Sequence, residues 1–199
     1  MEQIHNLLRK IIDKLFTRLY KLSFSTLGRQ STLCMPFCVN GAKYMNLGSN
    51  VYIKSNAWLL AVDLPEHNTN REKLFIGSNT YIGRNAHIVA LQKVYISEDV
   101  LMGDNVYIAD NYHGFDNGII PYKNQQIKFK KEVFIGPGTW LGENVCVLSA
   151  SVGKQCIIGA NSVVTKDIPD YSMAVGVPAR VVKRFDLETN EWIRCSNND

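Results

Sequence analysis

The sequence predicts an all-β fold in which the chain winds as a triangular coil, and two observations lead to this prediction. Aliphatic residues recur at every sixth position, as in IGSNTYIGRNAHIV, where they are Ile76, Ile82 and Ile88. Four positions after most of them stands a small or β-branched residue, such as Thr80 or Ala86. A six-residue period fits neither an α-helix nor a long strand, so each hexapeptide should form one short strand and one corner. Three hexapeptides then close one turn of the coil.

The repeat occurs between residues 45 and 182 and predicts about five stacked coils in a single domain spanning residues 1–199. The ladder positions are Leu47, Ile53, Leu59, Ile76, Ile82, Ile88, Ile96, Met102, Ile108, Ile135, Leu141, Val147, Val152, Ile158 and Val164. Gly-Xaa-Asn and Gly-Xaa-Gly tripeptides between them supply turn conformations that β-branched residues resist.

The two ends of the chain lie outside this repeat. Residues 1–24 predict an amphipathic helix, with apolar residues at positions 4, 7, 8, 11, 12, 15, 16, 19 and 22 and basic residues on the opposite face. One interpretation is that this helix packs within an oligomer. The alternative is a peripheral membrane contact, because basic amphipathic helices bind anionic surfaces. Residues 185–199 are expected to form a short helix and a tail.

Composition limits the class of protein. A hydrophobic fraction of 46% with 20% charged residues is typical of a globular chain, and a net charge of +4 is too mild to indicate nucleic-acid binding. There is neither a membrane-spanning run nor a secretory signal, so a cytoplasmic location is expected. The five cysteines, at positions 34, 38, 146, 156 and 195, match no disulfide framework and no zinc spacing, and no metal is expected.

The largest irregularity in the repeat begins at ADNYHGFDN. Ile108 and Ile135 lie 27 residues apart where six are expected, so residues 114–131 must leave the prism as a protruding loop. Long loops in compact domains are usually functional or disordered. His113 stands where this loop begins, which makes it the candidate for chemistry.

These features together resemble the hexapeptide-repeat acyltransferases. The repeat, YHGFD, GTWLGEN and IIGANSVVTKDIPDYSMAVGVPARVVKRF are similar to the branch of sugar O-acetyltransferases that includes galactoside, maltose and polysaccharide acetyltransferases, over about residues 45–185. The resemblance implies a left-handed parallel β-helix, a homotrimer, and acetyl-CoA bound in clefts between neighbouring subunits. Periodicity alone does not give the handedness, and left-handed crossovers depart from the general rule for parallel strands.

By this resemblance, His113 occupies the register position of the family's catalytic histidine. A neutral imidazole can take the proton of a sugar hydroxyl as the hydroxyl attacks a thioester, so no covalent enzyme intermediate is needed. Many relatives read Asp-His-Xaa-His-Gly where this chain reads DNYHG, so the first histidine is missing. We expect Asp110, Asn111, Tyr112 and Asp116 to contact the substrate. Either aspartate, or a backbone carbonyl, would orient the imidazole.

The coenzyme site follows from the C-terminal motif by the same resemblance. The residues expected there are Trp140, Gly142, Glu143, Ala160, Thr165, Lys166, Arg180 and Lys183. Lys166, Arg180 and Lys183 are the cations for the phosphates, and Trp140 walls the cleft. Some relatives have Ser where Glu143 stands, so a backbone N–H near Gly142 and Glu143 is the expected oxyanion donor.

The sequence therefore predicts an acetyl-CoA-dependent O-acetyltransferase that acts on a sugar hydroxyl, on a surface polysaccharide or glycoconjugate. An amino-sugar N-acetyltransferase and a streptogramin-type xenobiotic acetyltransferase are the alternatives within the class. A carbonic anhydrase would need three zinc histidines, whereas this chain has four histidines in all and none in the loop after His113. A non-catalytic scaffold would not need both His113 and the coenzyme motif. Acceptor specificity is expected in the loops at 64–73 and 114–131.

Overall fold

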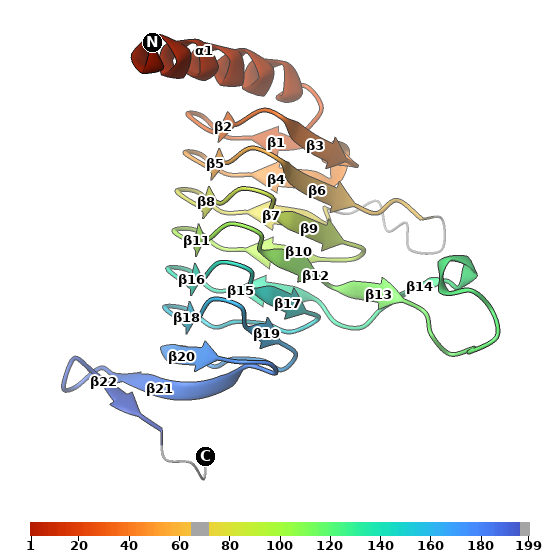
Figure 1. The fold of residues 1–199 in the computed structure, drawn as a ribbon, viewed down its shortest axis with the longest axis vertical. Coiled ribbons are helices and arrows are strands. Elements are labelled where there is room, and N and C mark those ends of the chain that lie inside the picture. Colours follow the sequence, from red (N-terminus) through yellow and green to blue (C-terminus); the bar gives the residue numbers. More distant parts are fainter. Residues whose placement is uncertain (65–71, 196–199) are drawn as a thin grey trace.

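The computed structural model describes residues 1–64 and 72–195, and it confirms an all-β fold of parallel strands behind an N-terminal helix (Figure 1). The chain visits three sheets in turn, which form the faces of a prism. Sheet A contains β1 (Thr26–Leu27), β4 (Met45–Leu47), β7 (Leu74–Ile76), β10 (Val94–Ile96) and β15 (Val133–Ile135). Sheet B contains β2 (Thr32–Leu33), β5 (Tyr52–Ile53), β8 (Tyr81–Ile82), β11 (Leu101–Met102), β16 (Trp140–Leu141), β18 (Ile157–Ile158), β20 (Ser172–Val175), β21 (Arg180–Asp186) and β22 (Glu191–Arg194). Sheet C contains β3 (Phe37–Asn40), β6 (Ala57–Ala61), β9 (His87–Ala90), β12 (Tyr107–Ala109), β17 (Cys146–Leu148) and β19 (Val163–Val164).

The predicted ladder residues fill the interior of the prism. All fifteen are buried, and none exposes more than 1% of its surface. Equivalent positions stack in register between coils, as Ile76 does on Ile96 and Ile82 on Met102. Each apolar side chain withdrawn from water in this way contributes about 1.5–3 kcal/mol, so the ladders are the main source of stability.

Asparagines take the left-handed backbone at most corners of the prism. Asn85 and Asn105 have φ angles of 55° and 60°, and their side-chain amides hydrogen-bond to each other across coils at 2.8 Å. The glycines that precede them have a different purpose. A Cβ on Gly83 would lie 2.2 Å from the carbonyl oxygen of Gly103, so glycine is required for the close stacking of successive coils.

The coil begins earlier than predicted, at Thr26 instead of residue 45. Strands β1, β2 and β3 form an additional coil that pairs with β4, β5 and β6. The six-residue period continues here through Leu27, Leu33 and Val39, but the corners carry Gln30 and Pro36 in place of asparagine. The usual corner signal is therefore absent, which is why the sequence prediction missed this coil.

The short helix predicted for residues 185–199 is wrong within the described residues. Strands β21 and β22 form an antiparallel hairpin, in which Phe185 pairs with Trp192 and their rings meet edge to face at 5.3 Å. The intervening residues include Asn190 with a φ of 59°, which is a turn conformation. Residues 196–199 lie outside the described part of the chain.

The N-terminal helix α1 (Glu2–Tyr20) lies across the first coil, close to the predicted range of 1–24 (Figure 1). Its polar face supplies acceptors to the edge of the prism. The Asp13 carboxylate accepts the backbone N–H of Met35 at 2.9 Å, and the Thr17 hydroxyl accepts that of Leu33 at 2.9 Å. The helix therefore covers a strand edge that would otherwise be open to pairing with another chain.

The predicted loop 114–131 is part of an excursion that projects sideways from the prism (Figure 1). It contains an antiparallel ribbon of β13 (Asn111–His113) and β14 (Ile127–Phe129), with a 3-10 helix at Tyr122–Asn124 between them. Ile127 and Phe129 pack against a small apolar cluster outside the prism, which includes the buried Leu91 and Ala109. The base of the excursion is thus fixed to sheet C. Most of the predicted 64–73 loop lies outside the described residues.

Candidate active site

His113 is the last residue of β13 and lies exposed where the excursion leaves the prism. The ribbon fixes its backbone, because His113 pairs with Ile127 and the next residue, Gly114, donates its N–H to the Gln126 carbonyl at 2.9 Å. A Cβ on Gly114 would lie 2.8 Å from that same carbonyl oxygen, so glycine is needed there. The imidazole therefore stands at a rigid, solvent-facing position, as a proton acceptor for a bound substrate requires.

Asp110 holds the start of the ribbon. Its side chain is fully buried, and its two oxygens accept the backbone N–H groups of Leu91, Gln92 and Lys93 at 2.7–2.8 Å. The Asn111 side-chain amide donates a further hydrogen bond to it at 2.7 Å. The Asp110 carboxylate is therefore not open to a substrate, whereas Asn111 is half-buried and its substrate contact stays a prediction. Asp110 instead ties the excursion to the corner between β9 and β10.

The other predicted acceptor-binding residues lie on the surface of the excursion. Tyr112 and Phe115 pack with ring centroids 5.5 Å apart. Since side chains alternate along a strand, Tyr112 points to the face of β13 opposite His113. Asp116 pairs with Lys128 across the ribbon, and this hydrogen bond raises the pKa of the Lys128 ammonium.

In the described structure neither predicted aspartate forms a hydrogen bond with the imidazole, and their role in orienting it stays a prediction. Asp110 is saturated by backbone donors, and Asp116 is held by Lys128. Among residues 1–64 and 72–195, no group forms a hydrogen bond with the His113 side chain.

Three cations converge at the C-terminal end of the prism. Lys166, Arg180 and Arg184 line one cavity of about 260 Å³. Asp167 also lines it, but its carboxylate is paired with Lys131 and accepts the Ser151 N–H at 2.8 Å, and these two bonds lower its pKa. The cavity therefore keeps a net positive charge suited to phosphate groups.

Arg184 was not among the predicted cations, but it lines the cavity together with Arg180 of the same strand, whereas Lys183 does not. The pairing of β20 with β21 shifts register between these residues, so their side chains do not follow a simple alternation. The sequence spacing alone therefore does not identify Arg184 as a lining residue.

The predicted oxyanion segment follows β16. The Gly142 N–H donates to the Ile158 carbonyl at 2.8 Å, so it is already engaged. In the described residues no acceptor bonds the N–H of Glu143, which leaves that donor available. Gly142 stacks so closely on the next coil that a Cβ would lie 2.7 Å from the Ala160 nitrogen. Thr165 is exposed beside Lys166.

Trp140 and His113 lie on different sides of the prism. Trp140 is on β16 in sheet B and is 49% exposed, whereas His113 follows β12 of sheet C. In Figure 1 the two strands β16 and β13 are at opposite sides of the prism. One chain therefore does not bring the predicted base and the predicted coenzyme wall together. Within the described ranges, no group of three or more His, Cys, Asp or Glu is placed to hold a metal ion.

Sequence comparisons match this arrangement to known proteins. Residues 132–166 match the family described as "Hexapeptide repeat of succinyl-transferase". The chain is 34% identical over 129 residues to the Escherichia coli protein named "Putative lipopolysaccharide biosynthesis O-acetyl transferase", a match that covers 61% of this chain and 66% of that protein. It is 47% identical over 93 residues to a Mycobacterium tuberculosis protein named "Probable acetyltransferase", covering 46% of this chain and 31% of that protein. The matches thus span 66% of the length of the first relative and 31% of the second.

Solved structures share the fold at lower identity. The N-acyltransferase AntD of Bacillus cereus, in complex with dTDP and 3-hydroxybutyryl-CoA, superposes with a TM-score of 0.72 at 18% identity, covering 86% of this chain and 89% of that chain. A maltose O-acetyltransferase of Clostridium difficile superposes with a TM-score of 0.56 at 22% identity, covering 90% and 88%. At these identities the likeness concerns the fold alone.

Proposed function

The chain belongs to the hexapeptide-repeat acetyltransferase family, and from this premise we propose that it transfers an acetyl group from acetyl-CoA to a sugar hydroxyl. The observation that carries the proposal is the position of His113. Its imidazole is exposed at the rigid end of β13, and the buried Asp110 carboxylate holds that strand in place. A base at a fixed, open position is what a hydroxyl acceptor needs.

In the proposed reaction His113 takes the proton of the sugar hydroxyl as the hydroxyl oxygen attacks the thioester carbonyl. The free N–H of Glu143 stabilises the negative charge that develops on the carbonyl oxygen. The carbon–sulfur bond then breaks, and the protonated His113 returns its proton to the leaving thiolate. Lys166, Arg180 and Arg184 hold the phosphates of the coenzyme.

We also propose that the protein acts as a homotrimer with a left-handed coil. The separation of His113 from Trp140 within one chain supports the trimer, because a neighbouring copy can supply the wall that one chain lacks. The handedness rests on the family relation. The proposed acceptor is a sugar of a surface polysaccharide or glycoconjugate, and it rests on the name of the Escherichia coli relative.

The test is an acetyl-transfer assay on a panel of hydroxyl and amino sugars, with the product identified by mass spectrometry. We expect His113→Ala to lower kcat by about 10²- to 10⁴-fold with little change in acetyl-CoA binding, since general-base assistance is worth that much. His5→Ala is the matched control, because His5 is exposed on α1. Full turnover by His113→Ala on the true acceptor would refute the proposal. Products acetylated at nitrogen would instead identify the protein as an acetyltransferase of amino sugars.

Two single substitutions, one inside the cation cavity and one outside it, test the coenzyme assignment. Arg184→Ala should raise the KM for acetyl-CoA by about ten- to a hundredfold, since a charge-assisted contact is worth about 1.5–3 kcal/mol. Lys183→Ala should leave KM nearly unchanged, because Lys183 does not line the cavity. Equal effects from the two substitutions would contradict the assignment.

A further inference from the structure

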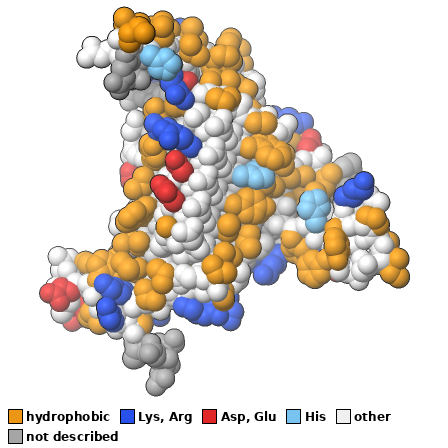
Figure 2. Space-filling view, in the orientation of Figure 1, with side chains coloured by type: hydrophobic (Ala, Val, Ile, Leu, Met, Phe, Trp, Pro, Cys, Tyr) orange, Lys and Arg blue, Asp and Glu red, His pale blue; other side chains and the backbone are white. Residues whose placement is uncertain are grey.

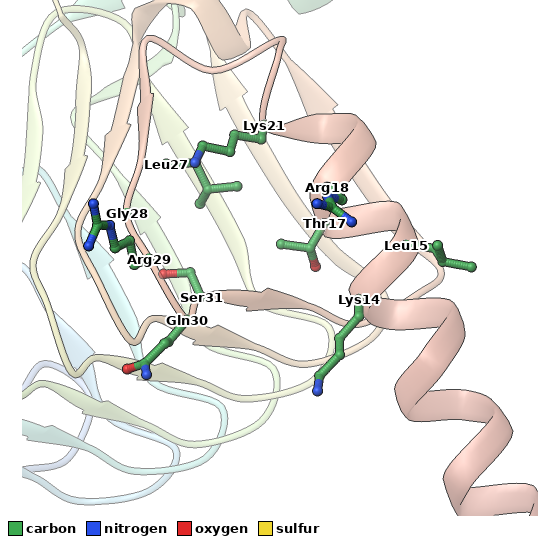
Figure 3. Close-up of a pocket in the computed structure, with 10 residues that line it drawn as sticks. All are labelled: Lys14, Leu15, Thr17, Arg18, Lys21, Leu27, Gly28, Arg29, Gln30 and Ser31. Carbon is green, nitrogen blue, oxygen red and sulfur yellow. The ribbon is translucent and has the colours of Figure 1, made fainter.

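The apolar face of α1 points away from the prism. The inner face is fixed by Asp13 and Thr17, which accept hydrogen bonds from the first coil. The apolar residues of the helix and its C-terminal extension lie on the other side, each between 37% and 91% exposed: Ile4, Leu7, Leu8, Ile11, Ile12, Leu15, Phe16, Leu19 and Leu22. Figure 2 shows hydrophobic side chains gathered at this end of the molecule, and in Figure 3 Leu15 points away from the first coil.

This orientation is the reverse of what core packing would give. An amphipathic helix of a globular protein normally turns its apolar stripe inward, and a contiguous exposed apolar patch marks an interaction site. In the described part of the chain no helix is long and apolar enough to cross a membrane. The exposed apolar face is therefore open to a partner outside this chain.

Cations from α1 and from the prism line two hollows beside the helix. Lys14, Arg18, Lys21 and Arg29 line the first, of about 280 Å³, between α1 and the first coil (Figure 3). No acidic residue lines it.

The second hollow, of about 310 Å³, is lined by Arg9, Lys10, Lys54 and Arg84. Its one acidic residue is Asp13, whose Oδ1 already accepts the Met35 N–H. Both hollows are thus open to external anions. The cations that line them belong partly to the helix and partly to the prism.

We propose that α1 docks the protein on an anionic membrane surface. The apolar face enters the boundary between headgroups and acyl chains, and the cations of the two hollows receive lipid phosphates. Charge complementarity favours this occupant over the face-to-face pairing of two α1 helices, because that pairing would bring their basic borders together. The proposal is independent of the acetyltransferase function.

The orientation of the docked molecule follows from the fold. Because α1 crosses the end of the prism, the coils stack away from the surface and the excursion with His113 projects sideways (Figure 1). The site remains accessible while the protein is held at the membrane.

The test is flotation of the full chain with phosphatidylcholine/phosphatidylglycerol vesicles and with phosphatidylcholine vesicles. Wild type should float with the anionic vesicles and lose binding at high ionic strength, since salt screens the phosphate contacts. Replacing Leu8, Ile11 and Leu15 by Ser should weaken binding by about tenfold or more, because apolar burial supplies much of the affinity. The matched control is Val177→Ser with Leu187→Ser, which removes exposed apolar groups far from α1.

A second pair of variants tests the charges. Lys14→Glu with Arg18→Glu should abolish the preference for anionic vesicles, whereas Lys123→Glu, on the excursion, should not. Thermal unfolding of every variant verifies the fold, since the substituted side chains face away from the core. Failure of wild type to bind anionic vesicles would overturn the proposal. The proposal would also be overturned if the Leu8, Ile11 and Leu15 to Ser variant had a smaller assembly mass than wild type by light scattering. That result would identify the apolar face as a contact between copies of the chain.

Discussion

The prism and the excursion are held together by different interactions. In the prism, each side chain has the role that its place in the six-residue period gives it, and the same burial repeats from coil to coil. The position of the excursion depends on single contacts. The main one is the Asp110 carboxylate, which accepts hydrogen bonds from three backbone N–H groups. A periodic structure tolerates loss at one point, whereas an arrangement built on one group does not.

The largest expected effect on stability comes from a substitution in the prism. It tests whether the ladder residues have a purely structural role. Ile82→Ala should lower the free energy of unfolding by about 2–5 kcal/mol, because it leaves a cavity in a fully buried ladder. Thermal or denaturant unfolding measures this loss. At a temperature where the variant stays folded, kcat should remain near that of wild type. A large fall in kcat would show that the two regions are coupled.

Asp110→Asn tests the excursion and should have a smaller effect on stability. The amide places an N–H₂ group among backbone donors and leaves some of them unpaired, at a cost of about 1–3 kcal/mol. Because β13 then loses its fixed start, we expect kcat to fall while the KM for acetyl-CoA stays unchanged.

Asp116→Asn is the control for this prediction, since Asp116 is exposed and pairs with Lys128 on the surface. Loss of stability in Asp110→Asn without any change in kcat would mean that Asp110 supports the fold but does not position His113.

The smallest effect concerns the link between the two regions, the Lys131–Asp167 pair. The hydrogen bonds from Lys131 and from the Ser151 N–H lower the pKa of the Asp167 carboxyl from its ordinary value. The carboxylate therefore stabilises the folded state above about pH 4, and this contribution is lost as the pH falls through the lowered pKa. The melting temperature of Asp167→Asn should fall less steeply below pH 4 than that of wild type. Parallel curves for the two proteins would contradict this assignment.

The period in the sequence predicted the prism well, because one rule governs many residues. It missed the first coil, where Gln30 and Pro36 replace the asparagine that marks a corner. It also failed at β21, which forms a hairpin with β22 and where Arg184 enters the cation cavity. Both failures occur where the chain leaves the regular pattern.

The site was predictable to a lesser degree. The register singled out His113, whose role as the base stays a prediction, and substrate contacts were assigned to Asp110 and Asn111 from their neighbourhood in the chain. The burial of Asp110 depends on its contact with residues 91–93, and a local sequence pattern does not contain that tertiary contact. The direction of the apolar face of α1 was open for the same reason, because it is set by Asp13 and Thr17 meeting the first coil.

The central claim is that one active site draws His113 from one chain and the wall with Trp140 from a neighbour. Two differently tagged variants, His113→Ala and Trp140→Glu, can be co-expressed and the doubly tagged assemblies purified. Each variant alone should be inactive. A mixed trimer contains one site in which both residues are intact, so we predict recovery of about one third of wild-type activity. Mixed assemblies as inactive as either variant alone would contradict the claim and place the whole site within a single chain.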